Sequence, residues 1–446
     1  MKAHLFTLFS ILIINVGICQ NEPNDCLFND NISDPVGLDI KGAASCNNYL
    51  SYIPGNNLNE TPILTFRVNI HIYRDSNGNG VFQPSDIPQF YNQIALVNEH
   101  FNNLLPPVLS VSPPAPFIPS SRIQFRLTNV YFHDDSDFYF SDESCGSIFY
   151  DTHGINKNTE INIFYYRGTD INPIGVGCGP YPYVNMREHT YLDWASSQLL
   201  AHELGHVLGL PHTFSGTCSN CTDDSYDDTF YPDCNRDWLP CGINSIANCN
   251  NNPIHTGISN NIMGYNTCRK YFSPKQIGRM HYNAIVFSNR RNYLDCNYDN
   301  AQSITISNSH SVWESAKFVR GDIIIQSGSS LSIRCDVYMP PTGKIIVQTG
   351  AKLIIDEGRI TSSCDNMWQG VMLHGNINQS QQIINGMPVY QGMVEMKNGA
   401  IIENAVNGIS TMRRDANGNI DWSSFGGIIR ASNSSFLNNK RDVEFM

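Results

Sequence analysis

A short stretch of this chain carries three histidines and one glutamate at a spacing that suits a catalytic zinc ion. His202 and His206 are four positions apart, so on a helix both imidazoles lie on one face. Gly209 favours a turn at positive φ, which would bring His212 back toward the same point. Three histidines leave the fourth position of tetrahedral zinc for water, as in catalytic rather than structural zinc sites. Glu203 lies beside the first ligand, where it can accept a proton from that water.

A methionine downstream of these histidines adds to the pattern. The order HExxHxxGxxH resembles the signature of the metzincin clan of zinc endopeptidases. Met263, in the sequence NIMGY, resembles the methionine that the clan's Met-turn places beneath the metal histidines. Tyr265 resembles the tyrosine that some metzincins hold close to the zinc, which implies that its hydroxyl helps to stabilise the oxyanion of the reaction. The alternative is a helix that carries histidines by accident, and five residue types at fixed spacing argue against it.

Within the clan, the chain most resembles the pappalysins, the family of pregnancy-associated plasma protein A. Residues 261–280 are similar to that family's Met-turn followed by Phe-Ser/Thr-x-x-Gln and Arg-Met. A segment similar to the family's Asp-x-x-x-Asp-Thr implies calcium ligands at Asp224 and Thr229. The family usually has proline next, where this chain has Phe230. The resemblance covers residues 61–292 and implies an α+β metzincin-like catalytic domain that acts on protein or peptide substrates.

Length and charge limit the class of protein. At 446 residues the chain is long enough for two or three domains, and its hydrophobic fraction of 41% allows real cores. The net charge of −12 argues against nucleic acid and against a polybasic membrane contact.

The N-terminus resembles a secretory signal peptide over residues 1–19. Lys2 supplies a positive start, and residues 5–16 form a short apolar run. Gly17 and Cys19 offer small side chains for cleavage before residue 20. An uncleaved anchor is the alternative, but the run is too short to span a bilayer comfortably, and no later segment is apolar enough to do so. The sequence therefore predicts a secreted protein.

Removal of that signal leaves thirteen of the fourteen cysteines. In an exported protein they predict disulfides, whose pairing the sequence does not determine. The Cys218-x-x-Cys221 pair alone could indicate a zinc ribbon, but there is no second CxxC after it. Six cysteines fall in a loop-rich stretch after the zinc motif: Cys218, Cys221, Cys234, Cys241, Cys249 and Cys268.

Residues 20–60 are rich in Asn, Pro and Gly, which predicts a pro-segment or an N-terminal arm. One hypothesis is that Cys26, Cys46 or a neighbouring aspartate blocks the metal until the segment is cleaved away. We favour the alternative that Cys26 and Cys46 form a disulfide with each other or with the body of the protein.

Residues 61–298 show the periodicity of a mixed α/β domain. Phe66, Val68, Ile70 and Ile72 alternate as in a half-buried strand. The helix that presents the zinc histidines should sit on a mixed twisted sheet, above a mostly irregular lower subdomain that begins at Gly209. The further expected elements are strands over 123–127 and 161–165 and helices over 90–104, 192–207 and 274–287.

A twelve-residue loop after the first strand resembles a calcium site. Asp75, Asn77 and Asn79 stand at positions 1, 3 and 5 of the loop, and Asp86 stands at position 12. We favour a calcium clip, and the alternative is a polar Asn-Gly turn.

Residues 299–446 change in composition to short apolar runs separated by Gly, Ser and Asn. Corresponding runs return at intervals near twenty residues, which predicts an all-β domain of parallel β-helix type. A β-sandwich is the alternative. The runs lie at 322–325, 331–333, 344–347, 352–355, 371–373, 394–396, 401–402 and 428–429.

The leading prediction is thus a secreted zinc endopeptidase in which Glu203 acts as general base and acid. One alternative is a secreted adhesion or binding protein whose C-terminal region contacts a cell surface or a glycan. Another is a glycan-acting enzyme, since β-helices often host lyases. The complete histidine set argues against an inactive protease domain, and no cluster of Asp with Arg or Lys at coil spacing supports the lyase.

Overall fold

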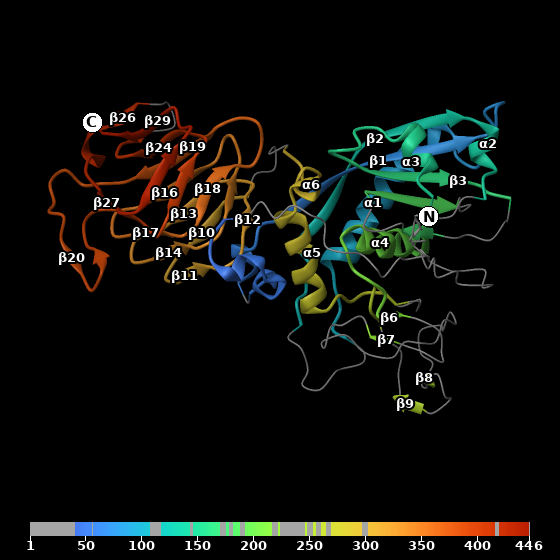
Figure 1. The fold of residues 1–446 in the computed structure, drawn as a ribbon, viewed down its shortest axis with the longest axis horizontal. Coiled ribbons are helices and arrows are strands. Elements are labelled where there is room, and N and C mark those ends of the chain that lie inside the picture. Colours follow the sequence, from blue (N-terminus) through green and yellow to red (C-terminus); the bar gives the residue numbers. More distant parts are fainter. Residues whose placement is uncertain are drawn as a thin grey trace, which may run out of the picture.

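The computed structural model contains a mixed α/β region and an all-β region, with a short N-terminal segment and helix α5 (Pro274–Val286) between them (Figure 1). No helix in the described part of the chain is long and apolar enough to cross a membrane. The predicted signal peptide and the six clustered cysteines lie outside the described residues. The structure describes residues 41–55, 57–107, 117–142, 146–169, 175–177, 182–187, 192–215, 222–223, 246–247, 253–255, 260–264, 269–296, 302–414 and 419–445.

A five-stranded sheet forms the scaffold of the α/β region. Its strands, in spatial order, are β2 (Ile123–Asp134), β1 (Leu64–Arg74), β3 (Ile161–Tyr166), β5 (Tyr183–Arg187) and β4 (Gly175–Gly177). The first four pair in parallel, and β4 pairs antiparallel with β5 at one edge. Parallel neighbours need crossover connections, and helix α1 (Ile87–Asn102) lies in the connection between β1 and β2.

Strand β1 is buried on both faces, although the alternation of its apolar residues predicts only one buried face. Ile70 and Ile72 face the main core and are fully buried, but His71 and Tyr73 on the other face are fully buried too. The reason is that β1 lies between β2 and β3 in a parallel sheet with both faces covered. The strand prediction is confirmed, and the prediction of one solvated face is wrong.

Helices cover the two faces of this sheet. Helix α1 (Ile87–Asn102) and helix α4 (Trp194–Val207) pack against one face and share the main hydrophobic core with it. Short helices α2 (Ser136–Tyr139) and α3 (Ile148–His153) contribute to a separate aromatic cluster on the other face. That cluster consists of Tyr73, Tyr139, Phe149, Phe164, Tyr166 and Tyr183.

The lower part of the α/β region has little regular structure among its described residues, as the sequence predicts. Helix α5 is an exception that the sequence also predicts. In the structure, Ser273 and Gln276 form a capping box at its N-terminus. The remaining elements are η4 (Pro84–Asp86), α6 (Ser288–Arg291) and the antiparallel pairs β6 (Phe214–Ser215) with β7 (Thr222–Asp223) and β8 (Ile246–Ala247) with β9 (Pro253–His255).

The N-terminal segment is wedged between helix α5 and the all-β region (Figure 1). It contains three short 3₁₀ helices: η1 (Ala44–Asn47), η2 (Tyr49–Tyr52) and η3 (Leu58–Glu60). The Tyr52 hydroxyl donates to the Cys46 carbonyl at 2.9 Å and accepts from the Ala316 amide at 3.2 Å.

A disulfide between Cys46 and Cys335 joins this segment to the all-β region. A Cys46 thiol that blocks the metal is therefore wrong, because that sulfur is bonded elsewhere. The favoured alternative, a bridge from Cys46 to the body of the protein, is what the structure has. Cys26 lies outside the described residues. A second disulfide links Cys296, at the end of the α/β region, to Cys364.

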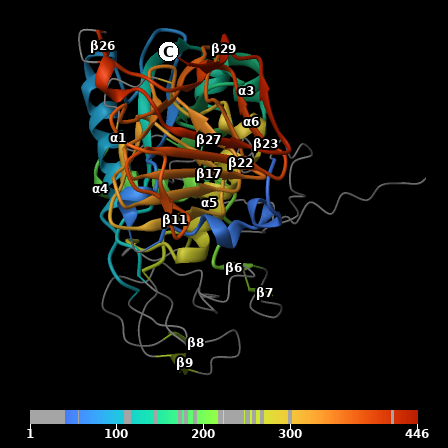
Figure 2. The same cartoon turned by 90° about the vertical axis from the view of Figure 1, so that its left-hand side faces the viewer.

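Three larger sheets, whose strand pairs are all parallel, form the body of the all-β region. The chain visits the sheets in turn, so that each strand pairs with the corresponding strand of the next coil. The strands of the second sheet lie one above another in Figure 2. The sheets are β10 (Ile304–Ile306), β13 (Ile323–Ile325), β16 (Lys344–Val347), β19 (Trp368–Leu373), β24 (Ala405–Ser410) and β29 (Arg441–Glu444); β11 (His310–Trp313), β14 (Ser330–Ile333), β17 (Lys352–Asp356), β22 (Met393–Lys397) and β27 (Ile428–Ala431); and β12 (Lys317–Phe318), β15 (Val337–Met339), β18 (Arg359–Ser362), β23 (Ala400–Glu403) and β28 (Ser434–Leu437).

Aliphatic side chains stack between successive coils of this region. Ile304 pairs with Ile323, and Ile323 with Ile345, at intervals of 19 and 22 residues that agree with the predicted spacing. Val371 pairs with Ile409, an interval of 38 residues. This longer coil contains the hairpin β20 (Ile383–Ile384) and β21 (Met387–Pro388), and the next coil contains the pair β25 (Arg413–Arg414) and β26 (Ile420–Asp421) with η5 (Trp422–Ser424).

Candidate metal centre

Helix α4 positions two of the three histidines. Its N-terminus is capped by Asp193, whose carboxylate accepts a hydrogen bond from the Ser196 amide at 2.9 Å. The helix therefore begins at Trp194, two residues after the predicted start. Its last two turns carry His202 and His206, and both imidazoles are fully buried.

The chain turns back after the helix at Gly209, as the sequence predicts. Gly209 has φ +88°, and the Leu210 amide donates to the Gly205 carbonyl at 3.0 Å. A Cβ atom at position 209 would lie 2.3 Å from Nδ2 of Asn283, so the turn needs glycine for space as well as for its backbone angle. Nδ2 of Asn283 donates to the Leu208 carbonyl at 2.9 Å and holds the turn against helix α5.

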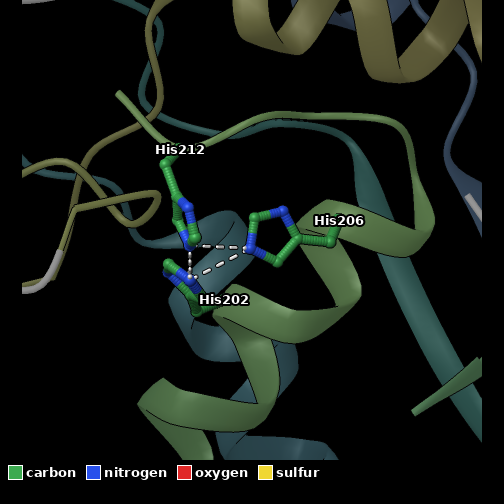
Figure 3. Close-up of side chains that lie close together, drawn as sticks. All are labelled: His202, His206 and His212. Carbon is green, nitrogen blue, oxygen red and sulfur yellow. Dashed lines mark hydrogen bonds between the residues drawn. The ribbon is translucent and has the colours of Figure 1, made fainter. Parts of the chain in front are cut away.

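The turn brings His212 to the two helix histidines (Figure 3). The Nε2 atoms of His202 and His206 are 3.2 Å apart, and Nε2 of His212 lies 3.1 Å from that of His206 and 3.2 Å from that of His202. Within the described part of the chain, these three form the one group of potential metal ligands with all ligand atoms within 4.8 Å. The structure thus brings together the three residues that the motif predicts.

Hydrogen bonds on the other ring nitrogens fix the tautomers of the helix histidines. Nδ1 of His202 donates to the Ile262 carbonyl at 2.7 Å, and Nδ1 of His206 donates to the Leu210 carbonyl at 2.7 Å. Because these Nδ1 atoms carry the protons of the neutral rings, each Nε2 presents a lone pair. Such carbonyl partners are the usual second contacts of metal-binding histidines.

Burial keeps the helix histidines neutral. Desolvation is the main cause that lowers the pKa of His206 to about 3; the hydrogen bond to the Leu210 carbonyl opposes this shift, and the nearby Arg269 adds to it. Desolvation also lowers the pKa of His202 well below its usual value, with Arg269 as the next cause. Neutral imidazole is the form that binds a metal.

The geometry of the three nitrogens fits zinc. Zinc–nitrogen bonds of about 2.0–2.1 Å in a tetrahedron place neighbouring nitrogens about 3.3–3.4 Å apart. The observed separations of 3.1–3.2 Å are close to this value. Three facing lone pairs repel one another unless a cation lies between them, so the donor set suits a divalent metal.

Glu203 and Met263 lie next to this histidine cluster. Glu203 directly follows His202 in helix α4 and is fully buried. Met263 is also fully buried, and its Sδ lies 2.4 Å from the point where a Cβ on Gly205 would stand. Met263 therefore packs directly on the helix between the two ligands, and its carbonyl accepts from the Thr213 amide at 3.3 Å.

Two polar residues that support this turn were not among the predicted site residues. Oδ1 of Asn261 accepts from the Met263 amide at 2.8 Å, and Nδ2 of Asn261 donates to Oε1 of Gln276 at 2.9 Å. Gln276 is also the capping-box residue of helix α5, where its Oε1 accepts from the Ser273 amide at 3.0 Å. The Ser-x-x-Gln pattern before an apolar run could have identified Gln276 as a cap, but nothing local indicates its contact with Asn261.

Three predicted site residues, Tyr265, Asp224 and Thr229, lie outside the described residues. The proposed calcium loop is described, and its carboxylates accept hydrogen bonds from nearby residues of the chain. Oδ1 of Asp75 accepts from the amides of Asn77 and Asn79, and Oδ2 accepts from the Asn79 side chain. Asp86 instead accepts from the Gln83 amide at 2.8 Å. Calcium binding here stays a prediction.

Comparison with known proteins supports the peptidase relationship. Residues 180–285, which include the zinc motif and the Met-turn, match the model of a peptidase family described as pregnancy-associated plasma protein-A. The match confirms the suspected resemblance to the pappalysins over this segment, and it supports a metalloendopeptidase.

Solved structures of one protease are similar to the chain, with low TM-scores. Mature mirolysin of Tannerella forsythia in complex with a cleaved peptide is 19% identical, with 52% of this chain and 96% of that chain covered and a TM-score of 0.38. Mirolysin in complex with compound 9 has the same identity and coverage and a TM-score of 0.36. At these TM-scores the likeness supports no conclusion about the activity of this chain. No curated protein matches the chain.

Proposed function

We propose that this chain is a secreted zinc endopeptidase and that His202, His206 and His212 hold one catalytic zinc ion. The observation that carries the proposal is the convergence of their three Nε2 atoms to within 3.1–3.2 Å. The family match falls on the segment that contains these histidines, which favours the protease over the alternatives in which the C-terminal region carries the main function.

Glu203 is the proposed general base and acid. Zinc in such a site supplies Lewis acidity toward the scissile carbonyl and lowers the pKa of a water molecule. The Glu203 carboxylate takes the proton of the attacking water and returns it to the leaving amine. Its burial beside His202 supports this role, because a carboxylate in a low-dielectric site interacts strongly with the charges that develop there.

Met263 and Tyr265 complete the proposed site. The packing of Met263 against Gly205 supports a role in holding the helix that carries the ligands. The Tyr265 hydroxyl is proposed to donate a hydrogen bond to the oxyanion as the tetrahedral intermediate forms.

Two further assignments belong to this proposal. The C-terminal region is a parallel β-helix, an assignment supported by three all-parallel sheets that the chain visits in a fixed order. A β-sandwich, in contrast, is built from two antiparallel sheets. Secretion agrees with the two disulfides, since such bonds persist in oxidising compartments.

The test of the proposed function is the variant Glu203→Ala, assayed for casein and peptide cleavage and for bound zinc. We expect zinc to be retained and hydrolysis to fall by about 10²–10⁴-fold or more. Glu314→Gln, at a half-exposed position in the all-β region, is the matched control and should leave activity unchanged. Full activity of Glu203→Ala with zinc retained would refute the role of Glu203. Undiminished proteolysis of the wild type after chelation, or a purified protein without zinc, would refute the metal site itself.

A further inference from the structure

A cavity whose described lining includes three arginines lies where the α/β region meets the all-β region. Its volume is about 220 Å³. The charged residues among its described lining are three arginines and one aspartate: Arg122, directly before β2, Arg126 of β2, Arg320 of the all-β region, and Asp295. Among the described lining residues this composition contrasts with the net charge of −12 for the whole chain.

Arg126 forms an ion pair with the aspartate of the cavity lining. Arg126 donates through Nε and Nη2 to the two carboxylate oxygens of Asp295, at 2.6 and 2.9 Å, and forms a bidentate pair. The Asp295 carboxylate in this ion pair is almost completely buried. The described lining therefore keeps a net positive charge, since it has one carboxylate for three guanidinium groups.

Arg122 is held rigidly and carries a charge without an acidic partner. Its Nε and Nη2 donate to the Thr61 carbonyl at 3.0 and 2.9 Å, and Nη2 also donates to Oε1 of Gln302. Both acceptors are neutral, and among the residues that the structure describes Arg122 forms no ion pair. Burial lowers the pKa of the Arg122 guanidinium from its ordinary value, because part of its hydration is lost.

The backbone of Arg122 is also in an unfavourable conformation. Its φ is +59°, a left-handed value that costs a side-chain-bearing residue free energy. Such strain persists only where the surrounding structure enforces it, and it concentrates at functional sites. Here it places Arg122 at the cavity, between the Thr61 carbonyl of one region and the Gln302 side chain of the other.

Arg320 contributes a guanidinium group to the cavity from the all-β region. It belongs to the connection between β12 and β13, and its Nη1 contacts the hydroxyl of Thr65 in β1. The same hydroxyl accepts from Nε2 of Gln124 at 2.8 Å. Guanidinium groups from both regions thus line one cavity.

We propose that Arg122, Arg126 and Arg320 form a binding site for a small oxyanion, phosphate or sulfate, that bridges the two regions. The planar guanidinium fork matches the oxygen geometry of such anions. A cavity of about 220 Å³ has room for one of them with several waters, each of which occupies about 30 Å³. Because its ligands come from both regions, a bound anion stabilises their contact and therefore the folded chain.

The experiment measures thermal unfolding of the full-length zinc-loaded protein against the concentration of inorganic phosphate and, separately, sulfate. Sodium chloride keeps the ionic strength constant, and isothermal titration calorimetry supplies the Kd. We expect the melting temperature to rise with either oxyanion and the effect to saturate. Arg122→Gln should weaken binding by about tenfold or more, since it removes a charge-assisted contact. Arg441→Gln, at an exposed position on β29, is the matched control and should bind as the wild type does.

Arg320→Gln provides a second test from the other side of the cavity and should also weaken binding. It keeps the proposal testable if Arg122→Gln fails to fold. An anion bound at the zinc would persist in both variants, so unchanged Kd values in them would overturn the proposal. Stabilisation by chloride equal to that by phosphate and sulfate would overturn it as well. Neither readout depends on peptide hydrolysis, so the outcome is independent of the proposed protease activity.

Discussion

The two regions of this molecule bury different kinds of side chain. The α/β region buries many polar groups around its helix and sheet, including His71, His202, Glu203, His206 and Asn283. The interior of the all-β region is instead lined mainly by stacked Ile, Leu and Val side chains of successive coils. A buried polar group costs free energy unless its hydrogen bonds are satisfied. The comparison indicates that chemistry is concentrated in the first region, while the second has a repeating core that needs no such partners.

The largest expected effect tests where the chemistry lies. His206→Ala removes one of the three converging nitrogens, and we expect it to abolish casein cleavage and the retention of zinc after dialysis. His310→Ala changes an exposed histidine of β11 and should leave both unchanged. Equal losses in the two variants would contradict the division of roles between the regions.

The next effect concerns the disulfide that joins the N-terminal segment to the all-β region. Replacement of both Cys46 and Cys335 by alanine should lower the free energy of unfolding by about 2–4 kcal/mol, because the disulfide closes a very long loop. Denaturant titration of the double variant against the wild type measures this. Peptide cleavage at low temperature should persist, since neither sulfur lies among the metal ligands. A double variant as stable as the wild type would mean that noncovalent contacts suffice to hold the segment.

Acid should destabilise the polar core of the α/β region. Nε2 of His71 donates to Asn69 and Asn162, so its Nδ1 accepts from Nε2 of His133 at 2.9 Å. Burial, and secondarily the nearby His133, lowers the pKa of His71 from 6.5 to about 3. The folded state therefore binds this proton less well than the unfolded state. The stabilising effect is fully present above pH 6.5 and is lost as the pH falls toward about 3.

For this single group, the loss between pH 7 and pH 5 is about 2 kcal/mol. Chemical denaturation at the two pH values measures it. His71→Gln should show a smaller difference between them, whereas the exposed-site variant His310→Gln should keep the difference of the wild type. An identical pH dependence in all three proteins would show that other groups control acid stability.

The smallest expected effect concerns the packing of Met263 against Gly205 of helix α4. A methyl group added by Gly205→Ala would meet Sδ of Met263, 2.4 Å from the new Cβ. Met263 has a flexible side chain that can adjust, so we expect a cost of about 1 kcal/mol together with faster zinc loss to a chelator. Gly55→Ala, where a Cβ has no neighbour within 4 Å, should change neither. An unaffected zinc off-rate in Gly205→Ala would show that Met263 does not support the ligands.

Local patterns in the sequence predicted the elements that local physics controls. The four-residue spacing of His202 and His206 and the glycine at 209 were sufficient to predict how His212 returns to them. Apolar alternation identified β1, but it gave the wrong exposure for His71 and Tyr73. Burial of a strand on its second face depends on neighbours that are distant in sequence.

The contacts between regions could not be predicted. With fourteen cysteines in the chain, nothing local pairs Cys46 with Cys335, 289 residues away. The Asn261–Gln276 contact and the Arg122 cavity likewise depend on tertiary packing. In the all-β region the twenty-residue period held only until the coil that contains the β20–β21 hairpin, because an insertion leaves the stacked core unchanged but lengthens the coil.

The long separation between Cys46 and Cys335 has a consequence for how the chain is made. A ribosome that adds about 5–20 residues per second needs roughly 15–60 s to reach the second cysteine after the first. During that time the Cys46 thiol meets cysteines that are synthesised before Cys335, including Cys145 and Cys178. A thiol–disulfide exchange catalyst would then be needed to correct wrong partners, so the yield of native protein should depend on the redox enzymes of the cell that produces it.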